Sequence, residues 1–519
     1  MKRVLSFFTI ATILVACGST SSPSKVEKTT EVSANPVTYA ETITATDLKT
    51  LLYTYASDEF QGRETGEEGQ KMAVNFLKEQ YIEDGIPAAK SDGNYFQNVP
   101  LEVLSAPNVS FSIDGKTFTA IDDYVSVTSS NNAVVNTDEV VYAGYGIEDE
   151  KYSDYETIDV KGKIVLFKSG EPRNAEGIFT VSGTNEASKW SNFRQQFASK
   201  KELAEKKGAK AVLFYYPEVY AMAAARFGGS SGRMALAGNA DDMMYFIIND
   251  NIGKTLVNDI ETNDKAQLLS TNISIDYKNN SKEITSENVA AIIRGSEKPD
   301  EYIIISAHLD HEGIKDGKIY NGADDDGSGT VAVLEIAEAF AKAKADGNGP
   351  KRSLVFLNVT GEEKGLLGSK YYTDVDPIFP LANTVADLNI DMIGRTDPNR
   401  EKKNRNYVYL IGSDKLSSEL HNISEMVNTK YMNIDLDYTF NADNDPNRFY
   451  YRSDHYNFAK NNIPVIFYFN GTHEDYHQPG DTPDKIQYDL LENRTRLVFY
   501  TAWELANRDA KIVVDKVVE

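Results

Sequence analysis

Cysteine is nearly absent from this chain. Cys17 is the only one in 519 residues, so the chain cannot close an intramolecular disulfide. After the N-terminal segment, apolar runs long enough to cross a membrane are lacking as well. Basic residues are outnumbered 54 to 78 by acidic ones, and the formal net charge is −24 at pH 7. This charge argues against nucleic acid as a partner and against charge-driven binding to an anionic membrane surface. The length predicts two or three domains with large cores.

The N-terminal segment indicates export. Two basic residues precede an apolar run over residues 4–16, which is too short to span a bilayer and is typical of a secretion signal. The run ends in Leu-Val-Ala-Cys17, which resembles the lipobox of a bacterial lipoprotein. We therefore expect residues 1–17 to be a lipoprotein signal and residues 18–44 a flexible tether. A lipid on Cys17 would anchor the protein at a bacterial membrane, facing the periplasm or the cell surface.

A β-rich module is expected within the body of the chain. Residues 45–135 contain amphipathic helices and alternating strands, which we assign to the first part of the main domain. Residues 136–284 then combine strands, a helix and glycine hinges, and 136–283 contain no His or Cys. The run Asp-Val-Lys-Gly-Lys-Ile-Val-Leu at 159–166 resembles part of a protease-associated (PA) domain. We interpret this insert as a lid or substrate-access domain; a mere spacer is the alternative.

The last part of the chain has an α/β pattern. Continuous apolar runs at 289–293, 302–306, 353–358, 385–390 and 464–469 alternate with helical segments between 285 and 519. Such runs predict a mostly parallel mixed sheet with helices on both faces. Functional sites in sheets of this kind lie at the C-terminal ends of the strands.

Side chains able to bind metal follow four of these expected strands. They are His308, Asp325, Glu362, Glu363, Asp391 and His477. Two histidines and three carboxylates suit two zinc ions that share one bridging carboxylate. One further carboxylate, not bound to metal, can take a proton from the attacking water, and the adjacent Glu362 and Glu363 can divide these two tasks. Asp310 lies two residues after His308, on the same face of a strand, and is therefore placed to hold it from behind.

Five separated motifs together resemble the M28 family of zinc peptidases. They are His-x-Asp at 308–310, Gly-Ala-Asp-Asp-Asp-Gly-Ser-Gly at 322–329, Gly-Glu-Glu at 361–363, Asn-Ile-Asp-Met-Ile-Gly at 389–394 and Tyr-His at 476–477. The resemblance covers roughly residues 45–135 and 285–515, and a PA-like insert also occurs in that family. It implies the zinc-exopeptidase fold and two Zn²⁺ per chain.

The resemblance also implies which residues bind each zinc ion. His308 and Asp391 would bind one ion, Glu363 and His477 the other, and Asp325 would bridge both. No member of this ligand set is missing from the sequence.

Catalytic roles follow from the same resemblance. Glu362 would be the general base and Asp310 the partner of His308. Tyr476 would donate to the tetrahedral oxyanion, with Tyr450 as a weaker candidate for that task. The implied reaction is removal of N-terminal residues from peptides with a free N-terminus, by zinc-activated water.

Other interpretations remain open. His473, Glu474 and His477 match the H-E-x-x-H motif of a mono-zinc protease, although that motif requires a helix and glycine and proline flank it here. A peptide-binding lipoprotein without catalysis is a second alternative. A carboxypeptidase or a glutaminyl cyclase on the same fold is a third. We interpret His311 and His455 as structural or site-lining residues, and the sequence does not indicate an oligomeric state.

Overall fold

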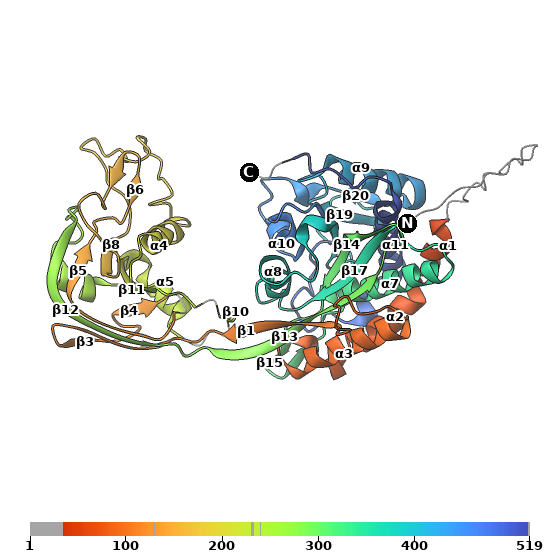
Figure 1. Ribbon diagram of the computed structural model, residues 1–519, viewed down its shortest axis with the longest axis horizontal. Coiled ribbons are helices and arrows are strands. Elements are labelled where there is room, and N and C mark those ends of the chain that lie inside the picture. Colours follow the sequence, from red (N-terminus) through yellow and green to blue (C-terminus); the bar gives the residue numbers. More distant parts are fainter. Residues whose placement is uncertain (1–34, 128–129, 230–232, 239, 517–519) are drawn as a thin grey trace, which may run out of the picture. The chain divides into compact units, whose positions relative to one another are not determined.

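The computed structural model describes residues 35–127, 130–229, 233–238 and 240–516 (Figure 1). The expected lipoprotein signal therefore lies outside the described residues. Within the described part of the chain, no helix combines the length and the hydropathy needed to cross a membrane.

A mixed sheet of nine strands holds the part of the chain that carries the metal-binding motifs. Its order is β10-β1-β13-β17-β14-β18-β21-β19-β20. The four central strands β17, β14, β18 and β21 are parallel, whereas the pairs on either side of this centre are antiparallel, except for β19 with β20. The expected sheet is thus confirmed as mixed; its parallel pairs are the three at the centre and β19 with β20 at one end. The bounds are β1 Phe96–Val103, β10 Met234–Leu236, β13 Lys282–Ile293, β14 Lys298–His308, β17 Arg352–Val359, β18 Thr384–Ile390, β19 Tyr407–Ile411, β20 Asp435–Asp437 and β21 Val465–Phe469.

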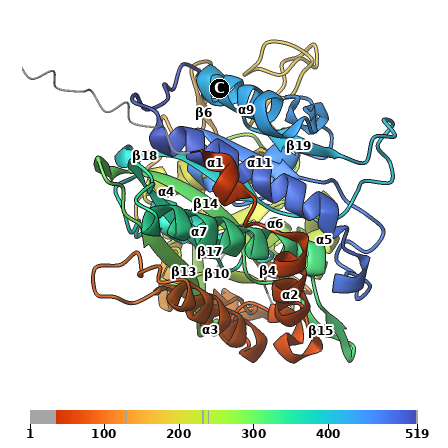
Figure 2. The same ribbon diagram turned by 90° about the vertical axis from the view of Figure 1, so that its right-hand side faces the viewer.

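Helices cover both faces of this sheet (Figures 1 and 2). On one face, Ile304 and Leu357 share a buried cluster with Tyr372 and Phe458, which come from α8 and α10. The opposite face is covered by α7 and α11, which pack through Phe340 and Phe499 with ring centroids 4.7 Å apart. The helices of this part are α1 Pro36–Ala40, α2 Ala45–Tyr55, α3 Glu68–Glu83, α7 Gly329–Ala345, α8 Leu367–Asp374, α9 Ser418–Val427, α10 His455–Ala459 and α11 Tyr488–Asn507.

The folded body begins earlier than the sequence indicates. Residues 36–44, which we assigned to the tether, form α1 and the cap of α2. Tyr39 is buried and stacks on Trp503 of α11, with ring centroids 5.7 Å apart. Thr44 ends the connection by accepting a hydrogen bond from the backbone N–H of Asp47, as an N-cap residue does. The expected boundary after residue 44 is therefore wrong, because two aromatic rings fix this segment on α11.

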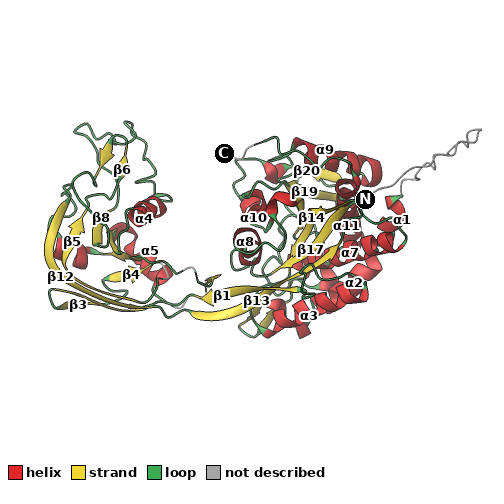
Figure 3. Cartoon of the chain, viewed as in Figure 1, coloured by secondary structure: helices red, strands yellow, loops and turns green. Residues whose placement is uncertain are grey.

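A second sheet, of eight strands, forms the inserted β-rich module (Figure 3). Phe246 and Tyr245 are neighbours on β11 and belong to different buried clusters, so both faces of this sheet are covered. Its order is β3-β2-β12-β5-β8-β9-β11-β4. The bounds are β2 Asn108–Ile113, β3 Lys116–Phe118, β4 Tyr124–Ser126, β5 Ala133–Tyr142, β8 Ile164–Lys168, β9 Ala211–Tyr215, β11 Met244–Ile248 and β12 Gln267–Lys278, with helices α4 Gln196–Lys206, α5 Pro217–Phe227 and α6 Asp250–Leu256.

The predicted start of the insert at residue 136 is too late. Strands β2, β3 and β4 pair in the second sheet, although we expected them in the main domain. Their alternating pattern predicts strands correctly but does not say which sheet they join. Two hairpins complete the fold: β6 Glu148–Asp149 with β7 Tyr152–Ser153, and β15 Gly313–Lys315 with β16 Lys318–Tyr320.

Candidate metal centre

The predicted ligands lie at one edge of the nine-stranded sheet. His308 is the last residue of β14, and Asp391 follows directly after β18. The loop after β17 carries Glu363, and the loop after β21 carries His477. Because these four strands are parallel neighbours, their C-terminal ends meet at the same edge.

Asp325 joins two groups of donors. Its Oδ1 atom is 3.1 Å from Nε2 of His308, which is 3.7 Å from Oδ1 of Asp391. Its Oδ2 atom is 3.1 Å from Nε2 of His477, which is 3.2 Å from Oε2 of Glu363. Since each carboxylate oxygen of Asp325 faces a different group, the five predicted ligands lie together as two sites that share one residue.

These donors fit two zinc ions. Zinc binds nitrogen and oxygen at about 2.0–2.2 Å, so an ion between two donors just over 3 Å apart can contact both. Nε2 of His308 and Oδ2 of Asp325 are buried and have no hydrogen-bond partner among the described residues. Buried polar atoms without a partner are costly, and a bound cation would satisfy both.

The metal-free cluster holds protons where cations would bind. Burial lowers the pKa of His477, but Asp325 and Glu363 raise it more, and the net value is about 10. The pKa of His308 is likewise raised against the effect of burial, by Asp325 and Asp391. For Glu363, burial and the charge of Asp325 raise the pKa, yet the neighbouring histidines outweigh them and bring it to about 2. The carboxylates therefore create a strongly negative site, which a divalent cation would neutralise.

Comparisons with known proteins agree with this geometry. The model of peptidase family M28 matches residues 288–502. This part of the chain is an M28 peptidase domain. A probable glutamate carboxypeptidase of Arabidopsis thaliana is 35% identical over 105 residues, which are 20% of this chain and 14% of that protein. A probable zinc metalloprotease of Pyricularia oryzae is 25% identical over 265 residues, covering 43% of this chain and 51% of the relative. The chain thus spans about half or less of the length of these curated relatives.

Two solved aminopeptidase structures are similar to this chain. An aminopeptidase from Aneurinibacillus sp. strain AM-1 is 20% identical, with 93% of this chain and 99% of that chain covered and a TM-score of 0.47. A zinc aminopeptidase from Bacillus subtilis is 18% identical, with 91% and 98% covered and a TM-score of 0.47.

In the M28 domain, Asp310 supports the site differently from our prediction. Its carboxylate is 4.0 Å from Nδ1 of His308, whereas its backbone carbonyl accepts a hydrogen bond from Nδ1 at 3.0 Å. This bond places the proton on Nδ1 and leaves Nε2 free for a metal. The carboxylate instead accepts from the backbone N–H of Glu362 at 3.1 Å and from the hydroxyl of Thr65 at 2.7 Å. Asp310 therefore positions both His308 and the predicted base.

Asp391 has a hydrogen-bond partner that the sequence does not predict. The hydroxyl of Ser453 donates to Oδ2 of Asp391 at 2.7 Å and accepts from Nδ2 of Asn389 at 2.9 Å. Ser453 lies 62 residues after Asp391, just before α10, so no local pattern connects the two. Its place directly before Asp454 and His455 is the only signal in the sequence that could have drawn attention to it.

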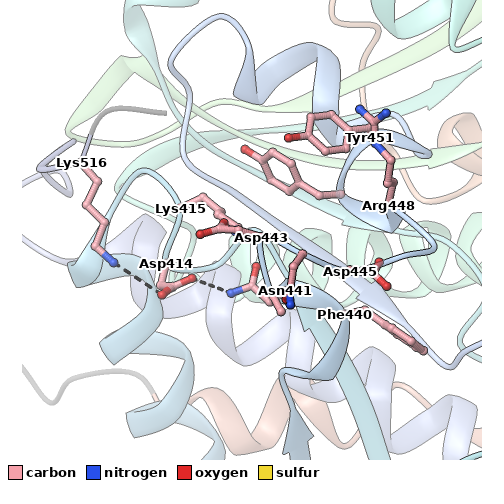
Figure 4. A pocket seen from close by; sticks show the side chains of 12 residues that line it. Asp414, Lys415, Phe440, Asn441, Asp443, Asp445, Arg448, Tyr451 and Lys516 are labelled. Carbon is pink, nitrogen blue, oxygen red and sulfur yellow. Dashed lines mark hydrogen bonds and ion pairs between the residues drawn. The ribbon is translucent and has the colours of Figure 1, made fainter. Parts of the chain in front are cut away.

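The two tyrosines considered as oxyanion donors, Tyr476 and Tyr450, line different cavities. Tyr476 lines the same small cavity as Glu362, Asp325 and Asp391. Burial raises the pKa of its phenol well above the usual value, so the hydroxyl keeps its proton and can donate a hydrogen bond. Tyr450 does not line that cavity. It lines a separate hollow of about 1080 Å³, so the structure gives no support to Tyr450 as a second oxyanion donor. Asp414, Asn441, Arg448 and Lys516 lie around that hollow (Figure 4).

The H-E-x-x-H interpretation is also wrong. Residues 474–477 form a turn, not a helix, so His473 and His477 do not share a helical face. Nε2 of His473 contacts the buried carboxylate of Asp324 at 3.1 Å. Glu474 points outward with a side chain 72% exposed, and it lies 3.5 Å from Arg395. Only His477 of this motif reaches the metal centre among the groups that the described residues form.

Proposed function

We propose that this protein is a di-zinc metallopeptidase that removes N-terminal residues from peptides. One observation carries the proposal: the two oxygens of Asp325 face two different histidine–carboxylate groups, each with an atom suited to zinc. His308 and Asp391 would hold one ion, and Glu363 and His477 the other. Bound there, two zinc ions would lower the pKa of a shared water molecule and polarise the scissile carbonyl.

The residues of the chain divide the remaining work. Glu362 belongs to none of the metal-binding groups formed by the described residues, yet it lines their cavity. Burial raises its pKa well above the ordinary value, and Glu363 adds to this shift, while His308 opposes it. A carboxylate with a raised pKa can hold a proton taken from water and then pass it to the leaving amine. The hydroxyl of Tyr476 would donate a hydrogen bond to the developing oxyanion.

The cavity wall favours an apolar first residue. Met392, Phe449, Phe467 and Phe469 line the cavity beside the three carboxylates. Aromatic and thioether side chains offer a surface for an apolar substrate side chain, while the acidic residues can hold a free α-ammonium group. This arrangement supports an aminopeptidase acting on peptides with neutral, apolar N-terminal residues.

Hydrolysis of leucyl- and alanyl-anilides, together with zinc content, tests this function. We expect about two zinc ions per chain and hydrolysis of the free-amine substrates. N-acetylated analogues serve as the matched control and should be cleaved at least about 100-fold more slowly, since they lack the ammonium group that the acidic residues would bind. Equal cleavage of the blocked analogues would contradict an aminopeptidase. Release of C-terminal residues would indicate a carboxypeptidase, ring closure of N-terminal glutamine a cyclase, and peptide binding without turnover a binding protein.

We also infer that the protein is exported and held at a bacterial membrane by a lipid on Cys17. The support is the charged and apolar start of the chain that ends in the only cysteine. Full-length protein should partition into the detergent phase, and the Cys17→Ser variant should not. Equal partitioning of both would remove the basis for the anchor.

A further inference from the structure

His311 lies beside the second metal position, although it is not one of the five expected ligands. It follows β14 by three residues, and its side chain is fully buried. Nδ1 is 2.8 Å from Oε1 of Glu363 and 3.8 Å from Oδ2 of Asp325. One ligand atom from each of His311, Asp325 and Glu363 lies within 4.8 Å of the others. His311 thus adds a nitrogen donor beside Asp325 and Glu363, two of the three residues expected to hold the second ion.

The short contact with Glu363 is an ion pair that lacks the alignment of a regular hydrogen bond. Neither ring nitrogen of His311 has a hydrogen-bond partner among the described residues, and Oε1 of Glu363 has none either. The two atoms are close but not aligned with each other. His308, an expected ligand, shows the same combination: a buried Nε2 without a hydrogen bond, close to oxygens of two carboxylates. Donors arranged in this way face a common point between them, as ligands of one cation do.

His455 shows that burial without a partner is not sufficient evidence. Both of its ring nitrogens are buried and lack a hydrogen-bond partner in the described part of the chain. Its ring stacks on Phe467 with centroids 4.7 Å apart, and burial lowers its pKa to about 3. No carboxylate of the described residues forms an ion pair with it, in contrast to His311. The convergence of carboxylates therefore distinguishes His311.

The fold holds His311 in this place. Its backbone N–H donates to the carbonyl of Arg63 at 3.2 Å. The guanidinium of Arg63 is itself buried and donates to the carbonyls of Leu309, Asn321 and Gly322. It thereby links the backbone just before His311 to the segment at 321–322. Gly322 has a φ of +55°, and a Cβ atom there would lie 2.5 Å from Cγ of His311. Glycine at this position therefore allows the imidazole to approach the carboxylates.

We propose that Nδ1 of His311 is a sixth protein ligand, which binds the zinc ion held by Glu363 and His477. This rests on the proposed di-zinc function. The second position would then have four protein ligands and the first only three. Four protein ligands are typical of closed, tightly held zinc, whereas three leave a position for exchangeable water. The two ions should consequently bind with unequal affinity, and His311 should be the cause.

Zinc titration of the metal-free protein, in competition with a chelator, tests the proposal. Wild type should bind two ions in two separate steps, the tighter one at the second position. His311→Ala should lower the zinc affinity of the tighter step by about 100-fold or more. Loss of a residue that only supports a metal ligand lowers zinc affinity by about 10- to 100-fold. His421→Ala is the matched control, because His421 contacts Ser413 and Tyr438 outside the metal centre, and it should change neither step. Zinc-edge X-ray absorption should detect three imidazole ligands for the two zinc ions in wild type and only two imidazole ligands in His311→Ala.

A second variant keeps a ligand at the position. His311→Cys loaded with Co²⁺ should show a thiolate-to-cobalt charge-transfer band in the near ultraviolet. Wild type, whose only cysteine is Cys17, should lack this band. Two zinc ions bound with unchanged affinities in His311→Ala, unchanged imidazole scattering, or no band in His311→Cys would overturn the assignment of His311 while leaving the di-zinc function intact. Fewer than two zinc ions in wild type would overturn both.

Discussion

Glu362 and Glu363 are adjacent in sequence but have different environments, so exchanging each for glutamine separates the two tasks. Glu362 lies in the cavity, outside the metal-binding groups, and its backbone N–H is fixed by Asp310 at 3.1 Å. Glu362→Gln therefore keeps the local structure and both zinc ions but removes the proton acceptor. General base catalysis contributes about 10²- to 10⁴-fold to the rate. At 1.36 kcal/mol per factor of ten, this corresponds to a loss of about 3–5 kcal/mol of transition-state stabilisation.

The measurement is kcat and kcat/KM on leucyl-anilide, together with zinc content. Glu362→Gln should lower kcat by about 10²- to 10⁴-fold with little change in KM, because a base acts in the chemical step. Glu363→Gln is the matched control, since Oε2 of Glu363 is 3.2 Å from Nε2 of His477. This variant should lose zinc from the second position. Zinc loss in Glu362→Gln, with full zinc retained in Glu363→Gln, would refute the assigned roles.

Three further outcomes are expected. Ser453→Ala removes the 2.7 Å hydrogen bond to Asp391 and should weaken zinc binding at the first position by about 10- to 100-fold, with the second unchanged in chelator competition. His473→Leu leaves the buried Asp324 without its imidazole partner at 3.1 Å. In denaturant titrations this variant should lower the unfolding free energy by about 3 kcal/mol or more, while two zinc ions still bind. Loss of zinc at unchanged stability would restore the H-E-x-x-H interpretation. The pKa of His477 is raised to about 10 without metal, so below that pH zinc must displace a proton. Calorimetry in buffers of different ionisation enthalpy should show proton release, and zinc affinity should rise with pH up to about 10; buffer-independent heats would contradict this.

Part of the site could be predicted because buried parallel strands leave a clear pattern in the sequence. Continuous apolar runs identified β14, β17, β18 and β21, and strand C-termini in such sheets carry the functional groups. His308, Asp391 and the pair after β17 therefore came together as expected. The boundary of the insert could not be predicted in this way. Strands β2 to β4 look the same in sequence whichever sheet they join, since pairing depends on partners far along the chain.

The candidate ligand types, their order and their positions at the ends of apolar strands can be read from the amino-acid sequence. Which side chains meet depends on the folded chain. It gave His473 a partner 149 residues away and moved that residue out of the metal centre. The backbone carbonyl of Asp310, and not its carboxylate, accepts the hydrogen bond from Nδ1 of His308. The fold also places His311 next to Glu363. The physical reason is that local periodicity fixes the face of a strand, whereas the direction and neighbours of a loop side chain depend on long-range packing that holds the loop in place.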